Sequence, residues 1–312
     1  MVGSKKTLPT LRGRVLSLNV TNKTVRDNYF EVMKKIAIIT LSQQGAEIAT
    51  ALTSPNLTGF KNLSGFSQFN EASLYVHQEV QTTQPAYRFT RVIELTAQIF
   101  HDYQGIIYIM PTGVVIRALN SQVRDKLHDP AVVVVDVGGR WAISLLSGHE
   151  GGANDLAMQV ANIIGVEPII TTTTDAIRRL IVGIGCRRGM SAERLIAAIQ
   201  DALTLIKRPL QEVRLFATAE PKQDEVGLLQ AAAQLQRPLR VIKAEEIRTC
   251  YRDFQVSHFV QTQVNLPAVA EPAALLAGRN TQLILKKQTF NGITIAIAEE
   301  NCMWLASAPA AP

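Results

Sequence analysis

From residue 36 onward, the chain alternates short apolar runs with segments of helical periodicity. Runs rich in Ile and Val are typical of strands buried on both faces of a sheet, and apolar residues every three to four positions are typical of covering helices. The strand-like runs of the first half lie at 36–39, 74–77, 106–110, 131–135, 141–146 and 169–170. This alternation predicts an α/β fold with a parallel or mostly parallel sheet.

The same alternation starts again at residue 181. Strand-like runs lie at 181–185, 213–217, 239–242, 281–285 and 293–297, and helical patterns lie at 191–199, 224–235 and 273–277. A short basic stretch at 176–180 separates the two halves. The fold prediction is therefore α/β, with two three-layer α/β/α domains that contain parallel or mixed sheets, at 34–176 and 181–300.

The two ends of the chain lack these patterns. Residues 1–33 are polar and without periodicity, and they predict a disordered leader. Residues 301–312 are mostly small and are interpreted as a tail.

Composition narrows the classes of protein. Hydrophobic residues make up 47% of the 312 residues and charged residues 19%, which supports a well-filled core. The net charge of +6 favours anionic partners. Basic residues are dispersed and aromatic residues are 6%, so no nucleic-acid surface is expected. The three cysteines are far apart and fit reduced thiols, and neither a membrane span nor a secretory signal is found, so the chain is expected in the cytoplasm.

The segment Ser147-Gly148-His149-Glu150-Gly151-Gly152 joins a predicted strand to a predicted helix. Its glycines allow the backbone to approach a ligand, and the N–H groups of a first helical turn face outward. A histidine with a pKa near neutrality can take a proton from water. We expect His149 to be the catalytic base, oriented by Glu150 or by Asp136.

Each of these residues also has a structural interpretation. A single histidine in a loop is commonly a surface group, and a glutamate in the first helical turn is stabilised by the helix dipole. Asp136 stands beside the glycine pair of a tight reversal, where hairpin geometry alone favours it. Asn154 and Asp155 fit helix caps as well as ligands.

Three turns follow strand-like runs, at 111–113, 147–152 and 171–175. Ligands in such sheets lie beyond the carboxyl ends of the strands, so the three turns are expected to meet on one edge. Arg117, Arg187 and Arg188 could bind carboxylates in bidentate fashion, although each is individually more typical of a solvated charge. Cys186 fits a packed small residue better than a nucleophile.

Several longer stretches resemble a known family. In the first half these are IMPTGVVIR at 109–117, KLHDPAVVVVD at 126–136, ISLLSGHEGGAN at 143–154 and PIITTTTD at 168–175. In the second half they are VGIGCRRG at 182–189, DEVGLL at 224–229 and EPAA at 271–274. Through these stretches, nearly everything after Met33 resembles the CbiG family, the cobalt-precorrin-5A hydrolases of anaerobic cobalamin biosynthesis.

The resemblance implies a reaction and a set of binding residues. The reaction is hydrolysis of the δ-lactone of cobalt-precorrin-5A with loss of C20 and its methyl group as acetaldehyde, giving cobalt-precorrin-5B. Backbone N–H groups at 148–152 would stabilise the oxyanion. The residues expected to bind substrate are Thr112, Gly113, Arg117, Ser147, Gly148, Gly151, Gly152, Asn154, Thr173, Asp175, Gly185, Arg187, Arg188 and Glu271.

The resemblance also implies partners. The cobalt belongs to the substrate, so neither a cofactor nor metal ligands of the protein's own are expected; an axial contact from His149 to that cobalt is an alternative. The expected partners are an anionic cobalt-corrinoid small molecule, other enzymes of the cobalamin pathway and a second copy of the chain in a homodimer. Nucleic acid and membrane are not expected.

One departure from the family leaves the function open. Family members commonly carry a middle segment between the two modules, whereas here Asp175 is followed almost directly by the strand-like run at 181. A non-catalytic corrinoid-binding or handover protein is therefore an alternative to the enzyme. A nucleotide- or sugar-phosphate-binding α/β protein is a further alternative, against which the absence of phosphate-binding glycine motifs argues.

Overall fold

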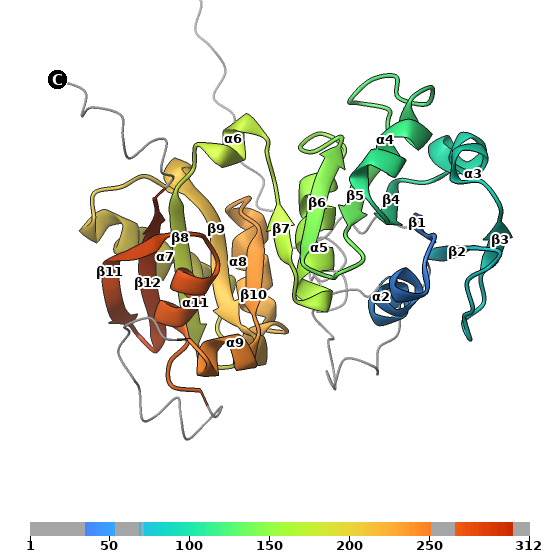
Figure 1. Cartoon of the computed structure of the whole chain (residues 1–312). Coiled ribbons are helices and arrows are strands. Elements are labelled where there is room, and N and C mark those ends of the chain that lie inside the picture. Colours follow the sequence, from blue (N-terminus) through green and yellow to red (C-terminus); the bar gives the residue numbers. More distant parts are fainter. Residues whose placement is uncertain (1–34, 54–68, 70–71, 251–265, 302–312) are drawn as a thin grey trace, which may run out of the picture.

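A computed structural model describes residues 35–53, 69, 72–250 and 266–301. Two β-sheets, one built from each half of the chain, lie side by side, and helices cover both (Figure 1). The predicted leader at 1–33 lies outside the described residues, as does the tail predicted at 301–312 except for residue 301.

The first sheet has seven strands in the order β3-β2-β1-β4-β5-β6-β7. Strands β1 to β5 pair in parallel, β6 runs antiparallel to β5, and β7 is parallel to β6. The sheet is therefore mixed. The strands are β1 (Ile36–Thr40), β2 (Ser73–His77), β3 (Tyr87–Phe89), β4 (Gly105–Ile109), β5 (Ala131–Val135), β6 (Trp141–Leu146) and β7 (Glu167–Ile169).

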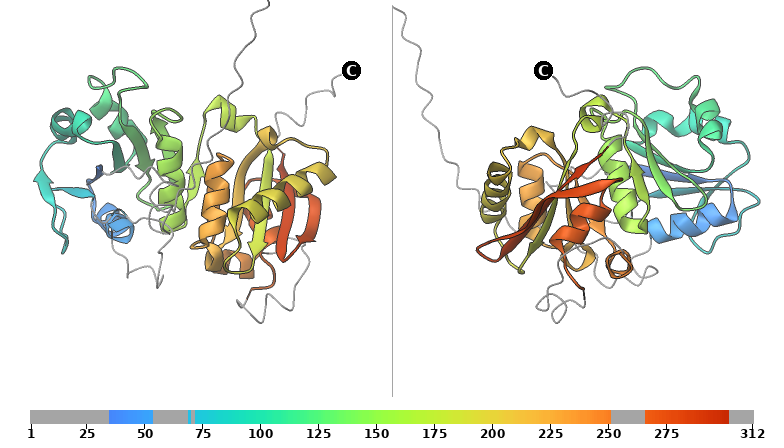
Figure 2. Two further views of the ribbon diagram at one scale, coloured as in Figure 1. Left: turned by 180° about the vertical axis from the view of Figure 1, so that it is seen from behind. Right: turned by 60° about the vertical axis from the view of Figure 1, so that its left-hand side comes forward.

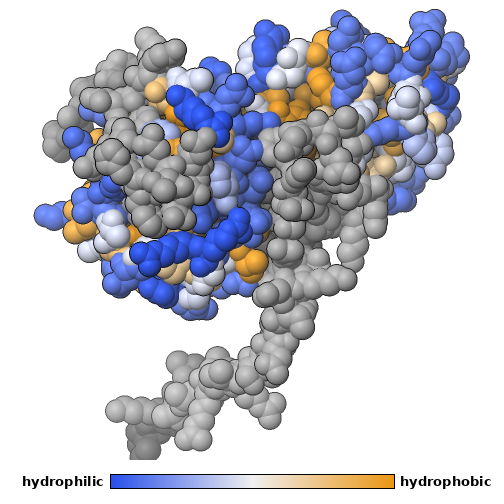
Figure 3. Space-filling view, turned by 90° about the horizontal axis from the view of Figure 1, so that it is seen from below, coloured by the Kyte–Doolittle hydropathy of each residue, from blue (hydrophilic) through white to orange (hydrophobic). Residues whose placement is uncertain are grey.

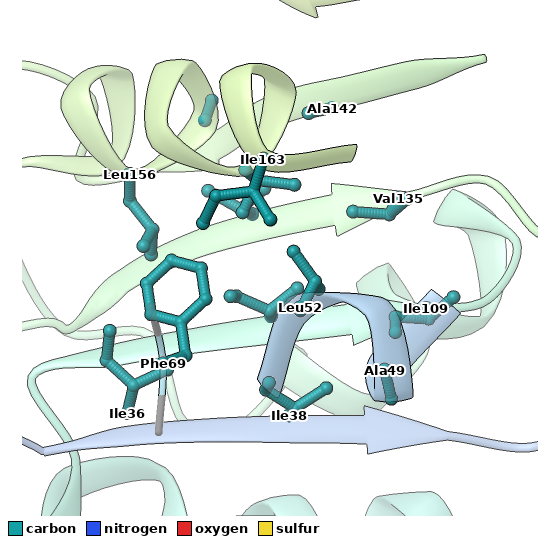
Figure 4. Close-up of a cluster of buried hydrophobic side chains, with 14 of the residues drawn as sticks. Ile36, Ile38, Ala49, Leu52, Phe69, Ile109, Val135, Ala142, Leu156 and Ile163 are labelled. Carbon is teal, nitrogen blue, oxygen red and sulfur yellow. The ribbon is translucent and has the colours of Figure 1, made fainter. Parts of the chain in front are cut away.

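Helices pack on both faces of this sheet because both faces of its central strands are apolar. All five residues of β1, β4 and β5 are buried. Helices α2 (Gln43–Thr53) and α5 (Ala153–Ile164) cover one face, while α3 (Val92–Ile99), the short η1 (Phe100–Asp102) and α4 (Thr112–Leu119) cover the other. Figure 4 shows the first of these layers, where Leu52 of α2 and Ile163 of α5 point toward Val135 of the sheet.

The second sheet has five strands in the order β10-β9-β8-β12-β11. Strands β8 (Leu180–Cys186), β9 (Val213–Ala219) and β10 (Leu239–Ile242) are parallel, and β12 (Ile293–Glu300) and β11 (Thr281–Phe290) are antiparallel neighbours. Helices α7 (Ala192–Leu205) and α8 (Val226–Gln234) cover one face, and α9 (Ala244–Arg248) and α11 (Ala270–Leu276) the other. Two short turns, η2 (Leu210–Glu212) and η3 (Glu220–Lys222), flank β9. The predicted α/β class with three-layer arrangements is confirmed.

Three short elements were not predicted from the sequence: β3, α9 and α6 (Thr173–Ala176). Each is too short to show a hydrophobic period, and tertiary or capping contacts decide its conformation. In α6, Thr173 and Thr174 lie in a single helical turn, and the hydroxyl of Thr172, just before it, donates to the Asp175 carboxylate at 2.6 Å.

The direction of β6 corrects the expected arrangement of the three turns. Because β6 and β7 run antiparallel to β4, their carboxyl ends lie at the end of the sheet where β4 and β5 begin. The turns at 147–152 and 171–175 lie at this end of the strands, together with the segment 120–130 that precedes β5. We call this end of the strands the glycine-loop edge. The turn at 111–113 follows β4 and therefore lies at the opposite edge.

The two halves meet where the edge strand β10 faces the carboxyl-terminal turns of α5. The Asn162 side chain donates to the Leu239 carbonyl at 2.8 Å and accepts from the Val241 N–H at 3.0 Å, so its amide takes the place of a neighbouring strand. Arg240, 7% exposed, donates to Asn162 and to the Val166 carbonyl. Figure 2 shows α5 at this junction from two further sides. Among the described residues, no helix is both long enough and apolar enough to span a bilayer.

Candidate functional site

The glycine loop at 147–152 folds back on the start of α5. The N–H of Ala153 donates to the Ser147 carbonyl at 3.1 Å, and the N–H of Asn154 donates to the Gly148 carbonyl at 2.9 Å. The first two N–H groups of the helix are therefore already bonded, which corrects the expectation that this turn is open to a ligand. Within the described part of the chain, the N–H groups of Gly148, His149, Gly151 and Gly152 make no such bond, so they are the donors of the loop that remain.

Glycine is required in this loop for close approach and for backbone conformation. A Cβ at Gly148 would lie 2.9 Å from the Thr172 side chain and 3.0 Å from Asn154 Oδ1. Gly152 has a φ of 83°, in the left-handed region that favours glycine. The loop therefore packs directly against the segment that follows β7.

Ser147 is the strained residue of the loop. Its φ is 57°, an uncommon value for a residue with a side chain, and it is 6% exposed. Its hydroxyl oxygen is buried and has no hydrogen-bond partner among the described residues. Strain and an unsatisfied buried polar atom are both more typical of functional sites than of structural loops.

A hydrogen-bond network joins α5 to the segment after β7. Asn154 Nδ2 donates to Asp175 Oδ2 and to Thr172 Oγ1, both at 3.1 Å, while its Oδ1 accepts from the Ser144 hydroxyl at 2.8 Å. Arg178 forms an ion pair with the other carboxylate oxygen of Asp175 at 3.1 Å. The predicted residues Asn154 and Asp175 are therefore brought together, and their side chains are occupied in holding the loop.

His149 and Glu150 are exposed at the tip of the loop. Glu150 forms an ion pair with Lys126 at 2.6 Å, and the hydrogen bond from Lys126, followed by that from its own N–H, lowers the pKa of Glu150. This ion pair ties the loop to the segment 120–130. Glu150 therefore interacts with Lys126 rather than bonding to the His149 ring.

Asp155, in the first turn of α5, was considered from the sequence as a helix cap or a ligand and was not among the expected site residues. Asp155 is an exposed residue, yet desolvation by nearby protein atoms is the largest cause that raises the pKa of its carboxyl. The negative charge of Asp175 raises the pKa of Asp155 further, and His149 lowers it, so both groups lie within electrostatic reach. A carboxyl with a perturbed pKa beside a histidine is a typical acid–base arrangement. Its place just after the SGHEGGAN stretch was the only sequence signal.

Asp136 lies at the opposite edge of the first sheet, one strand length of about 17 Å from the glycine loop. Its carboxylate accepts N–H groups of Arg140 and Trp141, both at 2.8 Å, and pairs with the Arg140 guanidinium. Burial alone would raise the pKa of Asp136. The hydrogen bonds from Trp141 and Arg140 and the charge of Arg140 together have the larger effect, so the pKa is lowered. Asp136 thus stabilises the hairpin between β5 and β6 and is not placed to orient His149.

Thr112, Gly113 and Arg117 do not join the loop either. Thr112 and Gly113 start α4 at the opposite edge, and the exposed Arg117 donates back to the Gly113 carbonyl at 3.1 Å. Figure 3 views the molecule from the side opposite α6, where hydrophilic and hydrophobic residues form a mixed surface.

The second-half candidates lie apart from the glycine loop. Gly185, Arg187 and Arg188 stand at the carboxyl end of β8, about 20 Å along that strand from α6. Arg188 pairs with Asp224 at 3.2 Å. Glu271, 1% exposed, accepts the Lys287 N–H at 2.9 Å, so its carboxylate is part of the core. Burial raises the pKa of the Cys186 thiol to about 11, which fits the packed role expected for it.

Apolar side chains are exposed along the glycine-loop edge. Leu127 and Val123 belong to the segment 120–130 and are 70% and 45% exposed, and Ile177, directly after α6, is 68% exposed. Thr173 is exposed beside them. The edge therefore offers apolar surface together with His149, Lys126 and the acidic groups. Among the described residues, no group of three or more His, Cys, Asp or Glu side chains is arranged to hold a metal ion.

Comparison with known proteins matches both halves of the chain to models of one protein family. The family model described as "Cobalamin synthesis G N-terminal" matches residues 94–175, and that described as "Cobalamin synthesis G C-terminus" matches residues 180–298. Only residues 176–179 lie between the two matches, in agreement with a missing middle segment.

Three relatives extend this assignment. "Probable cobalt-precorrin-5A hydrolase" of Methanocaldococcus jannaschii is 27% identical over 309 residues, covering 72% of this chain and 95% of that protein. "Cobalt-precorrin-5A hydrolase" of Salmonella typhimurium is 26% identical, covering 64% and 83%. "Protein CobE" of a Sinorhizobium species is 32% identical over 128 residues, covering 40% of this chain and 83% of that protein.

The strand-to-helix glycine loop, its network with Asp175 and both family regions thus occur in one chain. The chain belongs to the CbiG family and has a role in cobalamin biosynthesis.

Proposed function

We propose that the protein hydrolyses the δ-lactone of cobalt-precorrin-5A, releases C20 with its methyl group as acetaldehyde and yields cobalt-precorrin-5B. The observation that carries this proposal is the glycine loop, which presents His149 beside a desolvated Asp155 in a chain whose relatives are named cobalt-precorrin-5A hydrolases. A histidine and a carboxyl within electrostatic reach supply the base and acid that lactone hydrolysis needs.

The first step opens the lactone. His149 takes a proton from water as the water oxygen attacks the lactone carbonyl carbon. The acyl carbon–oxygen bond then breaks as the protonated imidazole returns this proton to the leaving C20 oxygen, and the new carboxylic acid releases its proton to solvent. The products are a carboxylate and an alcohol on C20. The N–H groups of Gly151 and Gly152 are among the donors available to the transient oxyanion, and Asp155 stabilises the protonated imidazole. Asp155 thereby takes the orienting role that the sequence suggested for Glu150 or Asp136.

The second step removes C20. When the base takes the proton of the new alcohol, the bond between C20 and the macrocycle breaks in retro-aldol fashion. C20 and its methyl leave as acetaldehyde, and the bonding electron pair stays on the macrocycle, which takes up a proton. No electron is gained or lost overall, so this sequence needs neither an oxidant nor a reductant.

The surface around the loop suits an amphipathic macrocycle. Exposed Leu127 and Ile177 offer apolar contact to a flat ring system, and Lys126 and Arg178 lie close by to balance carboxylate arms. The cobalt in this proposal arrives with the substrate, and the protein contributes no cofactor. Contacts with other enzymes of the pathway and with a second copy of the chain are part of the same proposal.

The direct test is incubation of the purified protein with cobalt-precorrin-5A, followed by measurement of acetaldehyde and of the mass of the corrinoid product. Stoichiometric acetaldehyde with the matching loss of C20 and its methyl supports the enzyme. Intact lactone after prolonged incubation at high protein concentration contradicts it.

One observation favours a second function, binding or handover of a corrinoid without catalysis. The relative named "Protein CobE" carries no reaction in its name, yet it is 32% identical over 128 residues. Tight binding of cobalt-precorrin-5A together with an unopened lactone would identify this second function, whereas turnover excludes it as the sole activity.

A further inference from the structure

The segment 120–130, the loop that joins α4 to β5 (Figure 1), carries a second histidine at the glycine-loop edge. Its Lys126 reaches the tip of the glycine loop, where the Lys126 Nζ donates to Glu150 Oε1 at 2.6 Å. His128 stands two residues after Lys126, so their Cα atoms are at most about 7 Å apart. Glu150 is the direct neighbour of His149. Two segments in contact at this edge therefore carry one imidazole each.

His128 is held by a carboxylate. Its Nδ1 lies 2.9 Å from both carboxylate oxygens of Asp125. An ionised carboxylate only accepts hydrogen bonds, so the Nδ1–H donates, and Nε2 is left as the proton acceptor on the far side of the ring. The His128 side chain is 79% exposed, so this side of the ring is open to a ligand. Among the described residues, no other histidine ring is hydrogen-bonded to a carboxylate.

The turn that carries this pair is built by hydrogen bonds. Asp125 Oδ1 also accepts the N–H groups of Leu127 and His128, at 2.9 and 3.1 Å. The N–H of the buried Asp129 donates to the Asp125 carbonyl at 3.0 Å, and the Asp129 carboxylate accepts the Arg124 N–H at 2.9 Å. The hydrogen bond from the His128 ring is the largest cause that lowers the pKa of Asp125. The pair is thus fixed by its own turn, whereas a typical surface ion pair depends on two flexible side chains.

The proposed function contains two proton transfers from oxygen. His149 takes the first proton from the water that attacks the acyl carbon. The second proton belongs to the C20 alcohol, which exists only after the acyl carbon–oxygen bond has broken. The two transfers therefore occur at different atoms and one after the other, and a second imidazole at the same edge can serve the second transfer.

Resting on the proposed function, we propose that His128 is the base of the step that removes C20 and that Asp125 is its positioning residue. The Nε2 of His128 takes the proton of the C20 alcohol, the bond between C20 and the macrocycle breaks, and the electron pair of that bond stays on the macrocycle. The protonated His128 then delivers this proton to the macrocycle carbon, so the base is regenerated and no electron is gained or lost. Leu127, which stands between Lys126 and His128 in the chain and is 70% exposed, gives the ring system an apolar contact beside this base.

The test separates the two steps in a single turnover of cobalt-precorrin-5A. Rapid quenching and mass spectrometry measure the intact lactone, the opened lactone, which is heavier by one water, and the product that has lost C20 with its methyl. His128→Ala should open the lactone at close to the wild-type rate and then accumulate the opened species, with acetaldehyde release slowed by about a hundredfold. Imidazole added to this variant should restore part of the release, because it replaces the missing base.

Asp125→Asn tests the positioning role. The amide oxygen can still accept N–H groups of the turn, but the negative charge that holds the His128 ring is removed. The opened lactone should accumulate again, with acetaldehyde release slowed less than in His128→Ala. His77→Gln is the matched control, because His77 lies at the carboxyl end of β2, at the opposite edge of the first sheet, and it should leave both steps unchanged.

Three results would count against the inference in distinguishable ways. Acetaldehyde release by His128→Ala at the wild-type rate would overturn it and leave the proposed function in place. Intact lactone in His128→Ala beside an active wild type would also overturn it, because His128 would then serve the first step. Intact lactone with the wild-type protein would overturn the proposed function, and this inference with it.

Discussion

The side-chain amide of Asn154 donates to the Asp175 carboxylate across 3.1 Å, and this contact joins the start of α5 to the segment that leads into the second sheet. Asn154 is 9% exposed, so the bond is shielded from water. Through it, the glycine loop, α6 and the junction between the halves share one hydrogen-bond network. The position of the glycine loop therefore depends on α6 and on Arg178 of the connector that leads to the second sheet.

Replacing Asp175 should disturb loop and junction together. Asp175→Ala leaves Arg178 and the Asn154 amide without their acceptor, so the free energy of unfolding should fall by about 1–3 kcal/mol. Turnover should fall by more than substrate affinity, because the loop loses its position. Urea unfolding and steady-state kinetics measure both effects, with the exposed Asp201→Ala on α7 as control. Unchanged kinetics in a folded variant would show that the network does not position the loop.

Asp155→Asn should make the protein more stable and less active. The folded-state pKa of Asp155 is raised above its ordinary value of 3.8, so the folded state binds the proton more tightly than the unfolded state. The contribution of Asp155 to the free energy of unfolding is therefore fully present at pH values below 3.8, and it is lost as the pH rises through the folded-state pKa. The neutral amide of the Asp155→Asn variant removes the free-energy cost of holding a desolvated carboxylate at pH 7.

Thermal unfolding of wild type and Asp155→Asn at pH 3.5 and pH 7, values on either side of the ordinary pKa, checks the sign. The variant should gain stability at pH 7 and little at the acidic pH. A wild type whose stability relative to the variant improves as pH rises would contradict the raised pKa.

Ser147→Ala should preserve or increase stability, because the buried hydroxyl has no hydrogen-bond partner among the described residues. Removing an unsatisfied buried hydroxyl recovers up to about 1–3 kcal/mol. If the hydroxyl instead bonds to substrate, affinity should fall while the free protein remains as stable or more so. Denaturant unfolding with and without a bound corrinoid separates these effects. A large loss of stability in the free protein would mean that the hydroxyl is already satisfied.

Asn162→Ala should uncouple the two halves. The substitution leaves the Leu239 carbonyl and the Val241 N–H of the edge strand β10 without partners. It also removes the side-chain oxygen that accepts a hydrogen bond from the buried Arg240. We expect a loss of about 2–5 kcal/mol and a broader urea transition than that of the wild type. The exposed Asn120→Ala serves as control. A single transition with unchanged midpoint would argue that this contact does not couple the halves.

The sequence predicted the strands well because buried strands are short, uninterrupted runs of β-branched residues. The run at 131–135 became β5 and the run at 239–242 became β10 without a shift in boundaries. The position of the turns was harder to predict than the strands. The tight reversal at 136–140 makes β6 antiparallel to β5, so the carboxyl end of β6 lies at the opposite edge of the sheet from that of β5. That single reversal separates Thr112 and Gly113 from the glycine loop.

The site was only partly visible in the sequence. Loop glycines and a histidine between a strand and a helix are a local pattern, so 147–152 could be found. The pairing of Glu150 with Lys126 and the contribution of Asp175 to the raised pKa of Asp155 depend on segments distant in sequence, which no local pattern reveals. Glycine motifs also mislead: a Cβ at Gly183 would lie 1.9 Å from the Ala270 carbonyl oxygen, so this glycine allows β8 and α11 to pack closely.

The central claim is that His149 is the base that opens the lactone. The most direct measurement is single-turnover release of acetaldehyde from cobalt-precorrin-5A by wild type and by His149→Ala, with corrinoid affinity measured in parallel. We expect His149→Ala to lose at least about a hundredfold in rate, with the corrinoid affinity changed by less than about threefold. Acetaldehyde release by His149→Ala at close to the wild-type rate would contradict it.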